Sequence, residues 1–177
     1  MTRRTEPRLR PSRAVEVSRS AVADRLGGFI YGTLLVLTVV VAGARAYPHG
    51  AGHVAALVAV TSVVFWIAHV YAHCLAEGVA KDEHLPVWVL RRVAKRELGI
   101  LEAAVPPVVA LSLGAFGLYS ARTAVWLAFG LALAVLVVQG LAFARVERLG
   151  RIGTLLVVAA NLGLGLALVV LKLLVSH

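Results

Sequence analysis

The chain has 177 residues, of which 60% are hydrophobic and 15% are charged, and its mean hydropathy is +0.87. A soluble domain of this size could not hide so much apolar surface, so the composition excludes an ordinary soluble protein. The charged residues cluster between long uncharged runs, which is typical of a polytopic helical membrane protein. The expected fold class is therefore all-α.

Residues 1–24 form a polar, Arg-rich tail that contains two prolines. We expect most of this tail to be disordered, with a short interfacial helix over residues 14–24, nearest the membrane. Nucleic-acid binding is disfavoured, because such surfaces interleave basic residues with aromatic ones and the tail has no aromatic residue. Its arginines instead suit contact with anionic lipid at the cytoplasmic face.

Five apolar runs predict a five-helix transmembrane domain over residues 25–177. Each run reaches the roughly 20 residues that a helix needs to cross a hydrocarbon core, and helices satisfy every backbone group within lipid. The predicted spans are about 26–46, 52–78, 98–119, 123–144 and 152–175. The first run is longer than the core of a secretory signal peptide, so we expect an uncleaved helix.

Residues 81–97, between the second and third predicted spans, mix apolar side chains with five basic ones around Trp88. This composition predicts a helix that lies in the headgroup layer on the cytoplasmic side.

The Lys and Arg residues predict the orientation. Fifteen of the eighteen lie before the first span or in the loops after the second and fourth spans, and only three lie on the other side. Because positively charged loops stay in the cytoplasm, we expect the N-terminus inside and the C-terminus outside. Arg outnumbers Lys fifteen to three, which hints at a GC-rich bacterial genome, and the expected location is the plasma membrane.

The second span contains the stretch FWIAHVYAHCLAEG, residues 65–78. Polar residues in and before it recur at helical spacing and share one face of the helix: Ser62, Trp66, His69, His73 and Glu77. An ionisable residue inside a span is a functional-site hypothesis by default, because its burial is costly. Tyr31, Glu102 and Asn161, in the first, third and fifth spans, are expected in the same cytoplasmic half of the bilayer.

Pro106 and Pro107 follow Glu102 by about one helical turn. A proline removes the hydrogen bond to the carbonyl four residues earlier, so the carbonyls of Glu102 and Ala103 lose their helical partners. Some transporters build cation sites at such helix breaks. The alternative is a plain kink whose carbonyls are satisfied by neighbouring groups.

Three interpretations of the polar residues remain open. Histidine titrates near neutral pH and acid–histidine chains relay protons in membranes, which favours proton or cation conduction. His69, His73 and Glu77, or Glu102, could instead hold a divalent metal ion. The third interpretation is a hydrogen-bonded seam between helices, although such pairs contribute only ~0.6 kcal/mol on average.

Catalysis has little support in the sequence. There is no serine nucleophile near a histidine, no Gly-rich phosphate loop and no H-E-x-x-H motif, so we expect no enzyme and no cofactor other than a possible divalent metal. The lone Cys74 rules out an internal disulfide.

Small residues recur at the spacing of helix-packing motifs. The pairs are Gly28 with Gly32, Gly130 with Ala134, and the run Ala159, Gly163 and Ala167. We expect close packing inside one bundle, and the alternative is the seam of a homo-oligomer.

Two short pieces resemble the prokaryotic and endolysosomal transmembrane-175 potassium channels: Arg25-Leu26-x-x-Phe29-x-x-Gly32 and Phe65-Trp66-x-x-His69. The resemblance implies an all-helical oligomeric channel in which Arg25, Trp66 and His69 belong to a supporting polar network. It also implies that Leu34, Leu35 or Leu37 forms a pore constriction. The family hallmark Phe-Ser-Asp reads Phe29-Ile30-Tyr31 here, and the family repeat has six spans where this chain shows five.

The sequence thus predicts a multi-pass membrane protein whose leading function is cation or proton permeation, as a possible homo-oligomer. The alternative is a non-transporting scaffold or assembly protein whose Arg-rich cytoplasmic face contacts a partner. A membrane-embedded divalent-metal-binding protein is the third hypothesis.

Overall fold

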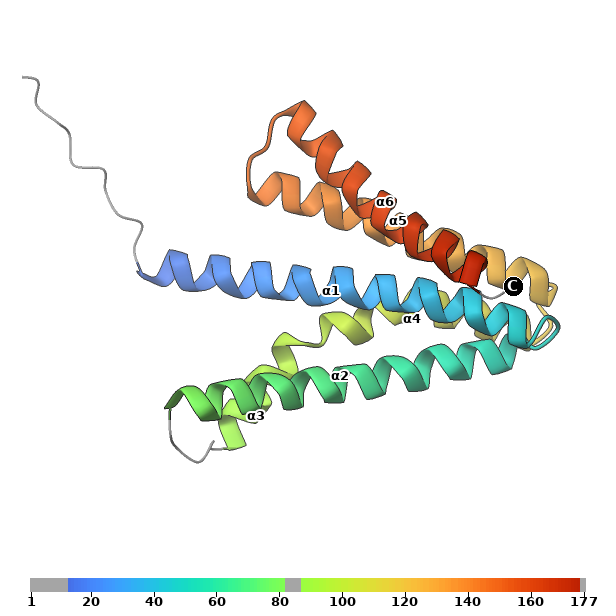
Figure 1. The fold of residues 1–177 in the computed structure, drawn as a ribbon, viewed down its shortest axis with the longest axis horizontal. Helices are drawn as coiled ribbons and strands as arrows, with labels where there is room; N and C mark the ends of the chain where they lie inside the picture. Colours follow the sequence, from blue (N-terminus) through green and yellow to red (C-terminus); the bar gives the residue numbers. More distant parts are fainter. Residues whose placement is uncertain (1–12, 82–86, 176–177) are drawn as a thin grey trace, which may run out of the picture.

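The computed structural model describes residues 13–81 and 87–175. Within these ranges every regular element is a helix, as predicted. The six helices are α1 (Arg13–Ala46), α2 (Ala51–Lys81), α3 (Val87–Arg96), α4 (Gly99–Ala115), α5 (Ala121–Val146) and α6 (Arg151–Val175). The long helices run back and forth along one common direction, and short turns join α1 to α2 and α4 to α5 at the same end of the bundle (Figure 1). We call this the turn end, and the opposite end, where α1 begins, the N-terminal end.

Four helical segments are long and apolar enough to cross a membrane. They are Gly27–Ala46, Ala51–Gly78, Ala121–Val146 and Arg151–Leu171, which overlap the predicted first, second, fourth and fifth spans. Helices α3 and α4 pass the same test only together, and they are bent by 45° at the break between them. By length and composition, the described chain therefore has four membrane-crossing helices, or five if the bent pair is one span.

The third predicted span, 98–119, differs most from the helix found there. Helix α4 has 17 residues, about 25 Å at 1.5 Å per residue, which is shorter than a typical hydrocarbon core. It ends at Ala115 because Gly117 takes a left-handed conformation, with φ of 83°, and reverses the chain. The hydroxyl of Tyr119 then folds back and donates a hydrogen bond to the carbonyl of Ala110.

The sharp bend in this part of the chain precedes the two prolines. Helix α4 continues through Pro106 and Pro107, and the break lies between Arg96 and Gly99. Of the two alternatives for the prolines, the continuous helix fits the plain kink better than a helix break.

The predicted tail, residues 1–24, is described only in part. Residues 1–12 lie outside the described range, and from Arg13 onward the chain is helical and continuous with the first span. The short helix expected near the membrane is thus the beginning of α1.

Helix α3 is the amphipathic helix expected within residues 81–97, of which 82–86 lie outside the described range. Its buried Val89 and Val93 pack against Val70 of α2. Trp88 is exposed, and the guanidinium of Arg92 lies 4.8 Å from the centre of its ring. The helix therefore lies against α2 with its basic and aromatic side outward, and its location in the headgroup layer stays a prediction.

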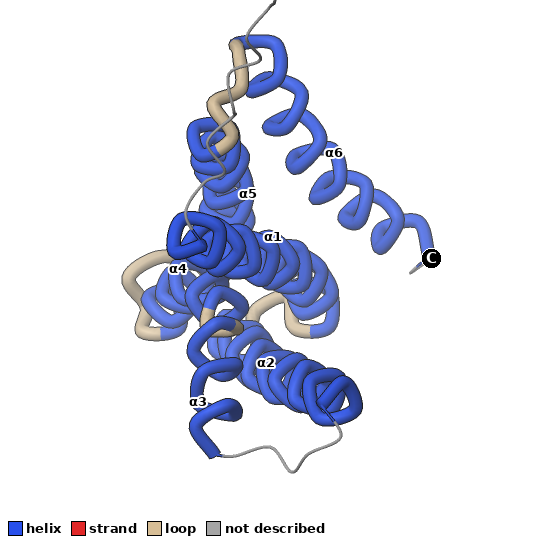
Figure 2. Tube along the Cα trace, turned by 90° about the vertical axis from the view of Figure 1, so that its left-hand side faces the viewer, coloured by secondary structure: helices blue, strands red, loops and turns tan. Residues whose placement is uncertain are grey.

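Helix α1 lies at the centre of the bundle and contacts α2, α4, α5 and α6. In the end-on view, α2, α3 and α4 lie on one side of α1 and α5 lies on the other, whereas α6 swings away from the rest (Figure 2). The main core fills the space between α1, α2, α4 and α5 towards the turn end, and its largest fully buried side chains are Val36, Val40, Val54, Val58 and Leu111. Helix α6 is the least buried of the four long apolar segments.

The three small-residue motifs do not share one role in the structure: one packs against another helix, and two do not. At Gly32 a Cβ atom would lie 2.8 Å from the Cα of Ile100, so α1 and α4 touch there backbone to backbone. By contrast, a Cβ atom at Gly130 or Gly163 would have nothing within 4 Å. The Gly28–Gly32 pair therefore serves packing inside one bundle, and the motifs on α5 and α6 face outward.

We predict that Gly32→Ala destabilises the protein by about 1–3 kcal/mol, the usual effect of overpacking a close contact. The added methyl group has the backbone of Ile100 in its way, and backbone cannot swing aside. Reversible unfolding of the purified protein by a denaturing detergent measures the change. Gly130→Ala is the matched control, and we expect it to be neutral or slightly stabilising. Equal stability of the two variants would contradict the packing described here.

Candidate functional site

A buried carboxylate, Glu97, lies in the bend between α3 and α4. Only 5% of its side chain is exposed. Its Oε1 atom is 3.4 Å from Nε2 of His73 and 3.5 Å from Nε of Arg96, and a Cβ atom at Gly28 would lie 3.4 Å from its Oε2. We call His73, Arg96 and Glu97 the polar corner; it joins α2 to the α3–α4 bend beneath α1.

The local backbone explains why this carboxylate tolerates burial. Glu97 lies two residues before Gly99, the first residue of α4, and the N–H of Ile100 donates to its backbone carbonyl at 3.1 Å. The N-terminus of a helix carries a partial positive charge that stabilises an anion. Arg96 and His73 add positive or hydrogen-bonding partners, as a buried charge requires.

The contacts of His73 define how its ring is protonated. Nη2 of Arg96 lies 3.5 Å from Nδ1 of His73, and a guanidinium can only donate. Nδ1 is therefore the acceptor, and in the neutral ring the proton is on Nε2, the atom nearest Glu97. The side chain of His73 is nevertheless 42% exposed, so it links a buried carboxylate to the outside of the bundle.

His69 lies one turn before His73 and belongs to a different set of contacts. Its Nδ1 is 3.2 Å from the carbonyl of Phe65, which only accepts, so this contact places the proton on Nδ1 and leaves Nε2 as the acceptor in the neutral ring. The ring of Tyr31, from α1, lies 4.9 Å from the ring of His69, and the rings of His69 and His73 are 6.5 Å apart.

The two histidines line one open groove along α2. The groove has a volume of about 480 Å³ and is lined by Phe65, Ala68, His69, Ala72, His73 and Ala76. The three alanines recur every fourth residue, so they form a narrow floor without bulky side chains. The groove places two imidazoles side by side on a surface that another helix can approach closely.

The other members of the α2 stripe differ in their contacts, and Trp66 is the one that joins two helices. Nε1 of Trp66 donates to the carbonyl of Ala94 at 3.1 Å, which ties α2 to α3. Ser62 is buried and donates to the carbonyl of Val58 in its own helix. Glu77 is half-buried one turn beyond His73.

The structure does not bring all the predicted site residues together. Asn161 is buried on α6, where its Nδ2 lies 3.5 Å from the carbonyl of Leu136 of α5, away from α2. Glu102 is half-buried in the first turn of α4, and the carboxylate paired with His73 is Glu97 instead. Arg25 belongs to α1, and its side chain is outside the described part of the chain.

The proposed pore-constriction residues differ in burial. Leu37 is fully buried in a cluster with Ala132 and Leu136, and Leu34 packs against that cluster. Leu35 is half-buried.

A metal site was one interpretation of His69, His73 and Glu77. Among the residues that the structure describes, no three His, Cys, Asp or Glu side chains form a group that could hold a metal ion. Metal binding therefore stays a prediction, and the geometry of the described residues gives it no further support.

Two buried polar residues are absent from the sequence-based predictions. Glu97 is one of them, because nothing local shows that the chain bends there and buries it. Gln139 was also missed, although an amide inside an apolar run is conspicuous. Its Nε2 donates to Oγ1 of Thr33 at 3.2 Å, and its Oε1 is buried without a hydrogen-bond partner among the described residues.

The polar groups do not continue through the bundle. Towards the turn end, the space between α1, α2, α4 and α5 is filled by fully buried aliphatic side chains such as Val36, Val58 and Leu111. One copy of the chain therefore presents titratable groups at its N-terminal end and a closed apolar core beyond them.

No protein-family model, curated protein or solved structure matches this chain. The all-helical fold and its long apolar helices are compatible with a multi-pass membrane protein.

We predict that Glu97→Gln lowers the free energy of unfolding by about 1–3 kcal/mol, since a buried hydrogen-bonded charge is worth this much. The amide keeps the shape but loses the ionic contacts to His73 and Arg96. Unfolding by a denaturing detergent measures the loss. Glu147→Gln, at an exposed position in the α5–α6 turn, is the control and should change stability by less than ~0.5 kcal/mol. A Glu97 variant as stable as that control would show that the polar corner contributes nothing to stability.

The Gln139–Thr33 contact gives a second prediction. Thr33→Val leaves the amide of Gln139 buried without its partner and should cost about 1–3 kcal/mol. Adding Gln139→Leu removes the stranded amide, so the double variant should regain most of that loss. A double-mutant cycle on the same unfolding assay tests this, and strictly additive losses would contradict it.

Proposed function

We propose that this protein is a multi-pass membrane protein that lets protons or small cations cross the membrane as a homo-oligomer. The observation that carries the proposal is the α2 groove, which presents His69 and His73, with His73 also 3.4 Å from the buried carboxylate of Glu97. The orientation predicted from the Lys and Arg residues puts this groove in the cytoplasmic half of the bilayer.

The chemistry of the polar corner suits proton movement. Histidine changes its charge near neutral pH, and acid–histidine chains are common proton relays in membranes. A proton that reaches His73 from the groove must bind Nδ1, because Nε2 already carries one. Nε2 lies 3.4 Å from Oε1 of Glu97, so that carboxylate is the acceptor within reach of the proton that Nε2 releases.

An oligomer is part of the proposal because one chain has a closed apolar core. A path across the membrane would then run between copies, along the outer face of α2. That face combines the alanine floor of the groove with exposed apolar side chains, among them Val60, Val64, Ile67 and Tyr71. Small residues let helices approach closely in lipid, where van der Waals contact drives association.

The resemblance to transmembrane-175 potassium channels supports the same proposal. It assigns Trp66 and His69 to a supporting polar network, and the bond from Trp66 to Ala94 suits such a role. Of the three candidate constriction residues, Leu35 is the best placed to face a neighbouring copy, because Leu34 and Leu37 pack inside one chain.

A second candidate, a non-transporting scaffold or assembly protein, is favoured by a specific observation. The polar side chains repeatedly tie helices of one chain together: Trp66 to Ala94, Glu97 to His73, Gln139 to Thr33 and Asn161 to Leu136. A bundle held by such contacts can serve to present its Arg-rich end to a partner.

Flux measurements in proteoliposomes separate the two candidates. We predict that the wild-type protein dissipates an imposed proton or K⁺ gradient, read with a pH-sensitive dye or a K⁺ electrode. His69→Phe should lower that flux at least about tenfold, equal to a barrier raised by ~1.4 kcal/mol, because it removes a titratable group from the groove and keeps its size.

His53→Phe is the matched control, since His53 is exposed at the turn end, and it should leave the flux unchanged. Circular dichroism and size-exclusion chromatography confirm that each variant is folded. A folded wild-type protein that passes no H⁺, K⁺ or Na⁺ between pH 5 and 8 would overturn the proposal and leave the scaffold as the better candidate.

A further inference from the structure

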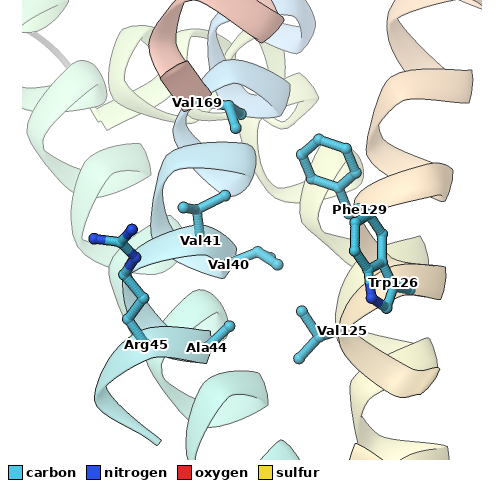
Figure 3. Close-up of a pocket in the computed structure, with 8 residues that line it drawn as sticks. All are labelled: Val40, Val41, Ala44, Arg45, Val125, Trp126, Phe129 and Val169. Atoms are coloured by element: carbon cyan, nitrogen blue, oxygen red, sulfur yellow. The ribbon is translucent and has the colours of Figure 1, made fainter. Parts of the chain in front are cut away.

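A second cavity lies at the turn end, away from the polar corner. Its volume is about 310 Å³, and it separates α1 from α5. In Figure 3, Val40, Val41 and Ala44 of α1 face Val125, Trp126 and Phe129 of α5, with Val169 of α6 at one end. The walls are almost wholly apolar, and Arg45 contributes the one charged side chain.

This apolar cavity continues into a more polar one. The neighbouring cavity, of about 410 Å³, shares Ala44, Val125 and Trp126 with it. Its other walls come from the α1–α2 turn and the beginning of α5, and they include His49, Ser120 and Arg122. We call the two adjoining cavities the slot: one is lined almost wholly by apolar side chains, and the other, which we call the mouth, also has polar ones.

The charge at this mouth is positive. Residues 44–56 and 113–126, which build the turn end, contain Arg45, Arg122, His49 and His53 but no Asp or Glu, and all nine acidic residues of the chain lie elsewhere in the sequence. Helix α5 also begins at this mouth, with Ser120 as its N-cap, and its partial positive charge adds to that of the arginines. The mouth therefore attracts anions.

We infer that the slot binds one anionic glycerophospholipid, with an acyl chain between α1 and α5, where Arg45 lies at the edge of the apolar cavity, and the phosphate at the mouth beside Arg122. A small soluble anion would not need the apolar cavity, and an apolar peptide would not need the basic mouth. A lipid has both parts in this order. Trp126 lines both cavities, and tryptophan is enriched at the depth where acyl chain meets headgroup.

The slot differs from the general lipid contact that any membrane protein makes. Its walls come from three helices that fail to close on one another, whereas protein interiors are normally packed to crystal-like density. An acyl chain there fills the gap between α1 and α5 and covers part of the ring of Trp126, which the protein alone leaves exposed. The inference is independent of ion permeation, because it concerns the opposite end of the bundle.

Quenching of tryptophan fluorescence by lipids with brominated acyl chains tests this site. The reporter protein carries Trp66→Phe and Trp88→Phe, so that Trp126 is its sole tryptophan, and it is titrated in detergent with brominated phosphatidylglycerol or phosphatidylcholine. We expect saturable quenching by phosphatidylglycerol and affinity about tenfold lower for phosphatidylcholine. The pair Arg45→Gln and Arg122→Gln should remove that preference, because charge-assisted contacts to phosphate are lost.

Matched controls locate the effect. Arg148→Gln with Arg151→Gln removes two exposed arginines at the other end of the bundle and should leave the preference intact. Val41→Phe fills the apolar cavity and should abolish saturable quenching, whereas Leu131→Phe, on an exposed part of α5, should not. Inorganic phosphate at millimolar concentration should not compete, and competition equal to that of the lipid would mean an anion site without an acyl slot.

Native mass spectrometry of the unmodified chain repeats the test without the tryptophan substitutions. It should show one retained phosphatidylglycerol, lost in the Arg45→Gln, Arg122→Gln variant. Equal, unsaturable quenching by both lipids, together with no retained lipid, would overturn the inference.

Discussion

The close approach of α1 to the beginning of α4 is the contact on which the rest of the structure depends. Gly32 lets the backbone of Ile100 come within the space that a methyl group would fill, and Gly28 leaves room for the carboxylate of Glu97. Helices in lipid gain little from the hydrophobic effect and associate through such close packing. Helix α3 precedes α4 across a 45° bend and lies against α2, and Glu97 is buried in that bend within reach of His73.

The two ends of the bundle then differ in chemistry. The N-terminal end holds the polar corner, with His73 lying between an open groove and a buried carboxylate. The turn end carries arginines and histidines without carboxylates in its sequence, around a slot between α1 and α5. The packed core around Val36, Val58 and Leu111 separates them. Proton chemistry at one end and lipid contact at the other can therefore be altered by separate mutations.

Hydropathy predicted the helices well because a membrane-spanning segment must be both long and apolar. It predicted four of the segments closely and fits the third least well, because Gly117 ends α4 before the expected 22-residue run is complete and the helix bends before Gly99. The helical spacing of Trp66, His69 and His73 also predicted a shared face. It did not show that Trp66 contacts α3 whereas His69 contacts Tyr31 of α1. The contacts of a helix face depend on the positions of the neighbouring helices, which the spacing does not give.

The sequence by itself determined the all-helical class, the approximate ends of the long helices and the presence of ionisable groups among apolar ones, because each follows from local composition and period. Only the tertiary structure decided which of these groups meet. Glu97 rather than Glu102 pairs with His73, Asn161 packs on α5 far from the α2 stripe, and Gln139 finds Thr33 across 106 residues of chain. Such partners depend on the crossing angle and the rotation of each helix. Close packing between helices sets both, and the sequence of one helix alone does not.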